Sequence, residues 1–276
     1  MTTTTRTAPR VTPRRSSAVS DSLVVTWRYL KRIPRIPELA IFAILQSIMF
    51  VVIFAVVLGG AMTIPGGGSY TEFLMPGIFA QTIVFASAIT AIGMVDDLTK
   101  GIIDRFRSLP MASGAVLTGR AISDVVYQGG IIIVLMLSGL VVGWTVRTGI
   151  TEFLAGFALM LAFVFAMTWL GVWMGLYVPS VEVAQQVVYT VLFPLTFLSS
   201  AFVPPSTLPP ILQPIAEWNP TSTLATGLRE LWGNPNPYTS DSLASTEPVL
   251  VTIGWIVLFV AIFAPLSVRK YRSMSR

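Results

Sequence analysis

Six long runs without a charged residue dominate this sequence and restrict the folds open to it. The runs cover about residues 39–58, 73–95, 125–146, 153–178, 187–203 and 249–268. A helix needs about 20 apolar residues to cross the roughly 30 Å hydrocarbon core of a bilayer. We therefore predict an all-α integral membrane protein with six transmembrane helices. The fifth run is the shortest and contains Pro194.

The few charged residues indicate how these spans are oriented. Only 11% of the 276 residues are charged, whereas a soluble domain carries about 25%. If the N-terminus lies in the cytoplasm, Arg147 and Arg229 are the basic residues on the outer side, and the other 16 of the 18 lie inside. Because basic residues accumulate on the cytoplasmic side of membrane proteins, we predict that both termini are cytoplasmic.

The residue types that the chain lacks exclude many kinds of site. Without histidine or cysteine, it cannot form a His- or Cys-ligated metal site, a Ser-His-Asp triad or a thiol nucleophile. None of its three lysines, Lys31, Lys100 and Lys270, stands in a G-x-x-x-x-G-K-[ST] phosphate loop. We expect no catalytic site, metal or cofactor in this chain, so any nucleotide energy that the protein uses must come from another chain. The absence of charge within the spans disfavours an ion-coupled carrier.

Within the spans, the polar side chains are mild. Gln46, Gln81 and Gln128 lie in the first three runs, and Gln46 and Gln81 could either hydrogen-bond across a helix interface or face a substrate path. Two G-x-x-x-G pairs, Gly139 with Gly143 and Gly171 with Gly175, could seat helices closely. Such pairs serve packing within one chain about as often as packing between chains.

The N-terminal region divides into a polar tail and a basic amphipathic helix. Residues 1–20 contain too little apolar surface to fold, so we expect a disordered cytoplasmic tail. From Asp21 onward a helical pattern begins, with Ser20 or Asp21 as a possible N-cap. One face of this helix carries Leu23, Thr26, Trp27, Leu30 and Ile33, and the other carries Arg28, Lys31 and Arg32. The helix could be a simple membrane anchor or an elbow helix that also contacts a partner.

A second amphipathic segment lies in the long loop between the second and third spans. Ile102, Ile103, Phe106 and Leu109 fall at helical spacing, and Pro110 ends the pattern. An exposed apolar ridge of this kind needs a membrane surface or a protein groove to cover it.

The segment between the fifth and sixth spans is rich in proline but also contains a helical pattern. Asn219 can cap a helix that starts at Pro220, and Leu224, Leu228, Leu231 and Trp232 share one of its faces. We predict short re-entrant or interfacial helices here. Arg229 and Glu230 lie in this pattern, where they serve either as a solvated surface or as a gate or exit contact.

The loop between the second and third spans carries a resemblance to a known family. Residues 97–111, DLTKGIIDRFRSLPM, followed by LTGR at 117–120, resemble the cytoplasmic motif of ABC-2-type permeases of the daunorubicin/doxorubicin-resistance branch. The resemblance implies that this loop is a coupling helix seated in a groove of a separate ATPase subunit. The residues assigned to that contact are Gly101, Ile102, Ile103, Asp104, Arg105, Phe106, Arg107, Leu109 and Pro110. The elbow helix, through Leu23, Trp27, Arg28, Leu30, Lys31 and Arg32, is implied to share it.

The resemblance also implies a function. Residues 21–268 would form an ABC-2-type transmembrane domain, followed by a cytoplasmic tail at 269–276. Two such permeases, identical or related, would pair with two ATPase subunits that bind ATP and magnesium in a bacterial cell membrane. The complex would export hydrophobic or amphipathic compounds such as antibiotics. A permease for lipid or polysaccharide precursors is one alternative, and a secondary carrier or a non-transporting membrane scaffold is another.

Overall fold

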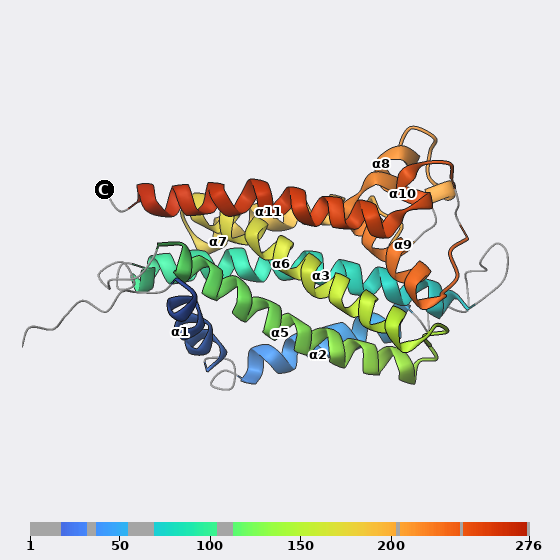
Figure 1. The fold of residues 1–276 in the computed structure, drawn as a ribbon, viewed down its shortest axis with the longest axis horizontal. Helices are drawn as coiled ribbons and strands as arrows, with labels where there is room; N and C mark the ends of the chain where they lie inside the picture. The colour runs from blue at the N-terminus through green and yellow to red at the C-terminus, as the bar shows by residue number, and fades with distance from the viewer. Residues whose placement is uncertain are drawn as a thin grey trace, which may run out of the picture.

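The computed structural model describes residues 18–31, 37–54, 69–103, 113–202, 205–237 and 240–274, and its regular secondary structure over these ranges is helical. The long helices run lengthwise through the molecule (Figure 1). They are α2 (Pro37–Val52), α3 (Tyr70–Thr99), α5 (Ser113–Val141), α6 (Ile150–Tyr177), α7 (Val181–Phe197) and α11 (Pro248–Ser273). This architecture agrees with the predicted all-α class.

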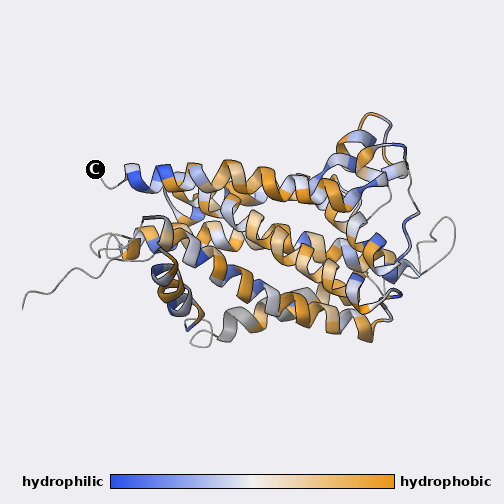
Figure 2. Cartoon of the chain, viewed as in Figure 1, coloured by the Kyte–Doolittle hydropathy of each residue, from blue (hydrophilic) through white to orange (hydrophobic). Residues whose placement is uncertain are grey.

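Length and apolar character identify the helices that can span a membrane. The helical segments Tyr70–Thr99, Gly114–Val141, Ile150–Tyr177 and Pro248–Ser273 are each 26 to 30 residues long and strongly apolar, and α7 is a shorter apolar helix. Apolar side chains occupy the middle of the bundle, whereas hydrophilic residues concentrate toward its ends (Figure 2). Many large apolar side chains are exposed along these helices, among them Leu140, Phe193 and Val257. A lipid environment would cover them, so the chain has the form of a multi-pass membrane protein.

The helix boundaries differ from the charge-free runs in several places. α5 begins at Ser113, well before the predicted start at 125, and ends at Val141 because Gly143 adopts a φ of +93° and turns the chain. α7 covers Val181–Phe197 instead of 187–203, and α11 continues to Ser273, into the predicted tail at 269–276. α2 ends at Val52, and residues 55–58 of the first run lie outside the described residues.

Two smaller groups of helices mark the two ends of the bundle. α1 (Ala18–Leu30) lies at one end, which also holds the C-terminal end of α11 (Figure 1). The opposite end holds η3 (Pro205–Thr207), α8 (Gln213–Trp218), α9 (Pro220–Trp232) and α10 (Leu243–Thr246). We call these the α1 end and the α9 end. α1 starts at Ala18, three residues before the predicted start, and residues 1–17 lie outside the described residues.

α3 occupies the centre of the bundle and is buried along most of its length. Gly171 and Gly175 of α6 lie against its backbone: a Cβ at Gly175 would lie 2.6 Å from the carbonyl oxygen of Ala91, and one at Gly171 would collide with that of Ser87. This glycine pair therefore packs helices within the chain. Near the α9 end, Pro76 lies inside α3 and removes one backbone hydrogen-bond donor there.

α9 forms where the sequence predicts a helix between the last two spans. The Asn219 side chain accepts a hydrogen bond from the Thr221 amide at 2.8 Å, and Pro220 occupies the first turn. Gly233, with a φ of +66°, ends the helix. Leu224, Leu228 and Trp232 are fully buried. The predicted cap, start and buried face are thereby confirmed.

Candidate functional site

At the α1 end, a buried polar network joins three helices. The Tyr29 hydroxyl of α1 donates to the Asp97 carboxylate of α3 at 2.9 Å, and Arg120 of α5 forms an ion pair with the same carboxylate. Arg120 also lies 3.9 Å from Asp124, whose carboxylate accepts a hydrogen bond from Thr90 at 2.7 Å. We call these five residues the α1-end network. It fixes the ends of α1, α3 and α5 relative to one another.

The α1-end network is well shielded from solvent. Asp97 and Arg120 are both buried, and the Arg120 guanidinium lies 5.2 Å from the centroid of the Tyr29 ring. Burial, followed by the charge of Asp97 and the hydrogen bond to it, raises the pKa of Tyr29 to about 12, although Arg120 opposes the shift. Tyr29 therefore stays protonated at neutral pH and remains a hydrogen-bond donor to Asp97.

An apolar cluster surrounds the network and includes the start of the predicted coupling segment. Ile103 is buried, and the cluster to which it belongs draws a side chain from each neighbouring helix. These side chains include Val25 of α1, Met94 of α3, Leu117 of α5, Trp169 of α6 and Tyr271 of α11. The first turn of the coupling segment is thus part of the same packed unit as α1.

The predicted coupling residues fall partly within the described chain. Gly101 has a φ of +64° and ends α3 directly before the segment. Ile102 is half-buried beside Ile103. The other members lie outside the described residues: Asp104, Arg105, Phe106, Arg107, Leu109 and Pro110.

The elbow helix, α1, packs through a different face from the predicted apolar one. Leu23 and Trp27 are 58% and 61% exposed, so they face away from the protein. The packed face carries Val25, Thr26 and Tyr29, and the Thr26 hydroxyl donates to the Gly119 carbonyl of α5 at 2.9 Å. Placing Thr26 on the same face as Leu23 and Trp27 was therefore wrong. The small Gly119 permits this approach, because a Cβ there would lie 2.6 Å from the Ser22 carbonyl oxygen.

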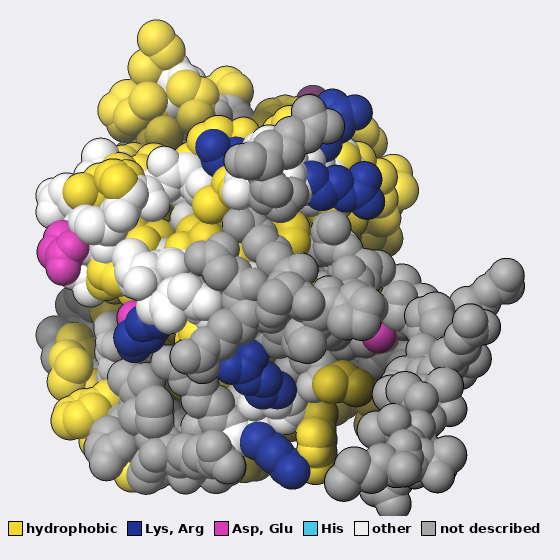
Figure 3. Space-filling view, turned by 90° about the vertical axis from the view of Figure 1, so that its left-hand side faces the viewer, with side chains coloured by type: hydrophobic (Ala, Val, Ile, Leu, Met, Phe, Trp, Pro, Cys, Tyr) yellow, Lys and Arg dark blue, Asp and Glu magenta, His cyan; other side chains and the backbone are white. Residues whose placement is uncertain are grey.

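The polar face of α1 contributes to a basic surface at this end. Arg28 and Lys31 are exposed, Leu30 is half-buried, and Arg32 lies outside the described residues. Lysine and arginine side chains gather on the face of the molecule seen in Figure 3, with few acidic ones among them. At the α9 end the exposed charges include Glu152, Glu230 and Asp241. Exposed basic residues are therefore more numerous at the α1 end than at the α9 end, where Arg147 is exposed.

Beside the middle of α3, a groove opens between α2, α3, α5 and α7. Its volume is about 330 Å³, which falls in the range of sites for drug-sized molecules. Its lining combines amides and aromatic rings, including Gln46, Gln81, Gln128, Phe50, Phe85 and Phe193. Gln46 is exposed and Gln81 is buried. The two glutamines assigned to a possible substrate path thus line one groove together with Gln128.

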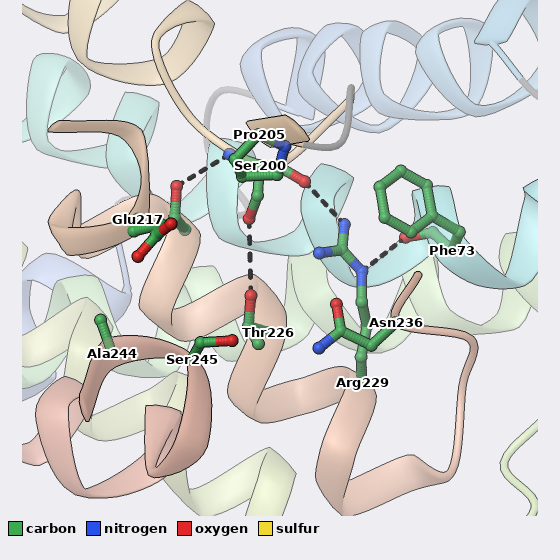
Figure 4. A pocket seen from close by; sticks show the side chains of 10 residues that line it. Phe73, Ser200, Pro205, Glu217, Thr226, Arg229, Asn236, Ala244 and Ser245 are labelled. Carbon is green, nitrogen blue, oxygen red and sulfur yellow. Dashed lines mark hydrogen bonds between the residues drawn. The ribbon is translucent and has the colours of Figure 1, made fainter. Parts of the chain in front are cut away.

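Arg229 occupies a position that the sequence analysis did not predict. Its side chain is completely buried, whereas Glu230 is exposed, so the solvated-surface interpretation was wrong for Arg229. The guanidinium donates from Nε to the Phe73 carbonyl and from Nη2 to the Ser200 carbonyl, both at 2.9 Å (Figure 4). It thereby joins α9 to the start of α3 and to the turn after α7.

Sequence reasoning also missed the α1-end network. Asp97 and Arg120 stand just outside the predicted spans, where a charged residue is expected to reach water. One signal was present: a carboxylate and a guanidinium lie at neighbouring ends of two adjacent predicted helices. Tyr29 gave no such signal, because its partner lies 68 residues away.

Comparisons with known proteins identify the family. The profile of the ABC-2 type transporter family matches residues 21–231. A daunorubicin resistance ABC transporter permease protein, DrrB1 of Streptomyces coeruleorubidus, is 30% identical over 261 residues, which cover 95% of this chain and 89% of the relative. The family match contains the α1-end network, the groove and most of α9. This chain therefore belongs to the ABC-2 type transporter family of ABC transporter permeases.

Proposed function

We propose that this chain is the membrane-spanning permease subunit of an ATP-driven exporter of hydrophobic or amphipathic compounds, antibiotics among them. ATP and magnesium bind to a separate ATPase subunit, and this chain has no catalytic site of its own. The name of the relative, a daunorubicin resistance permease, supports a drug as the substrate. The residue composition supports the absence of a nucleotide site, because the chain has no phosphate loop.

The observation that carries this proposal is that α3 connects the α1 end to the groove. Asp97, near one end of α3, belongs to the α1-end network. Gln81 and Phe85, further along the same helix, line the groove. A helix is stiff along its axis, so a force applied at the coupling segment reaches the groove through α3. This arrangement supports a permease that converts closure of an ATPase into a change of access.

We further propose the arrangement of the complete transporter. The chain crosses a bacterial cell membrane six times, and both termini are cytoplasmic. The basic α1 end, where Arg28 and Lys31 are exposed, then faces the cytoplasm and meets the ATPase through residues 101–110 and α1. Two permeases, identical or related, pair with two ATPase subunits, and residues 21–268 form the transmembrane domain.

The groove is the proposed substrate path. Phe50, Phe85 and Phe193 offer apolar surface, while Gln46 and Gln81 offer hydrogen bonds without a fixed charge. This chemistry suits an amphipathic molecule with a flat ring system. It is a poorer match for a heavily charged sugar precursor, which would need charged or many polar partners.

The coupling assignment is tested by placing a charge on the proposed docking ridge. Phe106→Asp should abolish co-purification of the ATPase and ATP-dependent efflux, because a carboxylate would replace the apolar anchor. Leu243→Asp, an equivalent change at an exposed leucine of α10, is the matched control and should preserve both. Complex assembly and efflux that survive Phe106→Asp would contradict the assignment.

The substrate and energy source are tested in vesicles that contain the permease and its ATPase. Daunorubicin efflux should require ATP, and Gln81→Leu should change the relative rates for a panel of amphipathic drugs without reducing ATPase co-purification. Transport that continues without ATP would indicate a secondary carrier. Transport of a lipid-linked sugar in place of every drug would indicate the precursor permease.

A further inference from the structure

The guanidinium of Arg229 lies among neutral hydrogen-bond acceptors. Nε donates to the Phe73 carbonyl, and Nη2 donates to the carbonyls of Ser200 and Ala201 at 2.9 and 3.4 Å. The Phe73 ring centroid lies 3.9 Å from the guanidinium carbon. Across the described residues, Arg229 forms no ion pair, and its Nη1 has no hydrogen-bond partner.

This environment leaves a positive charge without compensation. Carbonyl dipoles and an aromatic face stabilise a cation in part, but a buried charge normally has an ionised partner. Arg120 follows this rule, because it pairs with Asp97. Arg229 is more deeply buried than Arg120 and departs from the rule.

A small pocket lies beside the unpartnered nitrogen. Its free volume is about 20 Å³, enough for one water-sized particle. Hydroxyl groups of Ser200, Thr226 and Ser245 and the amide of Asn236 line it, and in Figure 4 Nη1 of Arg229 points into this space. Each of these groups can donate a hydrogen bond to an anion.

One acidic residue, Glu217, also lines the pocket. Its carboxylate accepts hydrogen bonds from the hydroxyls of Ser240 and Ser242, at 3.0 and 2.6 Å. Glu217 is therefore held by the residues just before α10, on a different side of the pocket from Arg229 (Figure 4). Its negative charge weakens the binding of an anion without removing the unpaired charge of Arg229.

We propose that this pocket binds one small anionic group, with Arg229 as its charged ligand and the neighbouring hydroxyls as hydrogen-bond donors. The group is either a free ion such as chloride or the phosphate of a phospholipid headgroup with a net negative charge, and both sources share this chemistry. The site lies at the α9 end, apart from the groove beside the middle of α3.

The test compares thermal unfolding of the purified full-length protein in a neutral detergent with sodium chloride or sodium gluconate at constant ionic strength. Chloride should raise the apparent Tm by roughly 2–4 °C in a saturable manner. Arg229→Gln should remove this dependence. Arg147→Gln, at an exposed arginine of the same end, should retain it. A parallel arm in chloride-free nanodiscs compares phosphatidylglycerol with phosphatidylcholine, so Arg229-dependent stabilisation there identifies the headgroup as the source.

Glu217→Gln keeps the proposal testable if Arg229→Gln fails to fold. Removing the negative charge from the pocket wall should lower the half-saturating concentration of the stabilising anion several-fold. An unchanged or higher half-saturating concentration would overturn the proposal. The proposal would also be overturned if neither chloride nor phosphatidylglycerol stabilised the unmodified protein in a saturable manner.

Discussion

Arg120 and Arg229 are both buried arginines, but they solve the same electrostatic problem in different ways. Arg120, at the α1 end, pairs with Asp97 and lies close to Asp124. Arg229, at the α9 end, donates to backbone carbonyls and faces the Phe73 ring. One guanidinium sits inside a network of opposite charges, and the other joins segments through neutral groups.

The two arginines differ in whether their charge is neutralised within the protein, and this determines what each end of the bundle can do. At the α1 end the charge of Arg120 is compensated within the protein by Asp97 and Asp124, so α1, α3 and α5 can move together without exposing an unpaired guanidinium. At the α9 end the charge of Arg229 has no ionised partner among the described residues, so a bound group can neutralise it. The paired charges at the α1 end suit a region that moves as one unit. The unpaired charge at the α9 end suits a site that binds a group from outside the protein.

Removal of Arg120 should cause the largest loss of stability. Arg120→Leu leaves Asp97 buried without its cation, and loss of one partner of a buried pair costs about 3–5 kcal/mol. The free energy of unfolding, measured by chemical unfolding in detergent micelles, should fall by this amount. The double variant Arg120→Leu with Asp97→Leu should recover much of the loss, because the charge of the buried Asp97 is then removed together with that of Arg120, and Asp124, whose side chain is 28% exposed, is the carboxylate that stays without this cation. Equal losses in the single and double variants would show that the pair is not the source of the effect.

Arg229→Leu should produce the next largest loss. The substitution leaves the carbonyls of Phe73 and Ser200 without a donor, at a cost of about 2–3 kcal/mol by the same unfolding measurement. Since no carboxylate pairs with Arg229 across the described residues, there is no second substitution that should restore stability. Recovery by Glu217→Leu would instead reveal a hidden ion pair.

Gly119→Val tests the contact between α1 and α5 without altering a charged residue. The added side chain would meet Ser22 and Val25 of α1, and overpacking of this kind costs about 2 kcal/mol. We expect α1 to pack less tightly on α5, so limited proteolysis should cleave the chain near α1 more rapidly. Gly114→Val on the same helix, where a Cβ meets nothing within 4 Å, should leave the cleavage rate unchanged.

Tyr29→Phe should give the smallest effect. It removes the hydrogen bond to Asp97 but keeps the ring beside Arg120, so the cost should be about 1 kcal/mol. The raised pKa of Tyr29 has a consequence for pH: its stabilisation is complete below about pH 10 and is lost as the pH rises toward about 12. Unfolding measurements at pH 8 and 11 should therefore converge for the variant and the unmodified protein at the higher pH.

Local signals in the sequence were sufficient for much of the fold. The cap at Asn219, Pro220 in the first turn and the stop at Gly233 act over a few residues, so α9 could be located from its own segment. The charge-free runs similarly located the long helices to within a few residues at most ends. The start of α5 at Ser113 was missed because its first turns contain Arg120 and Asp124, whose charges interrupt the charge-free run.

The candidate site depended on contacts that no local pattern encodes. Arg229 meets Phe73 across 156 residues, and Thr26 meets Gly119 across 93. Thr26 was assigned to the outward face of Leu23 and Trp27, whereas α1 packs through Thr26 together with Val25 and Tyr29. In a membrane, an apolar face is as well suited to lipid as to protein, so hydrophobicity alone does not identify the packed side.

Pro76 interrupts the backbone hydrogen bonding of α3 close to the α9 end. Between Pro76 and Asp97 the helix forms an arm of roughly 30 Å, with Gln81 and Phe85 near its fixed part and the α1-end network at its tip. If α3 tilted by about 5° at Pro76, the Asp97 end would move by roughly 3 Å, whereas Gln81 and Phe85 would shift by about 0.7 and about 1.2 Å. A displacement of α3 at the α1 end would thus become a smaller displacement at the groove.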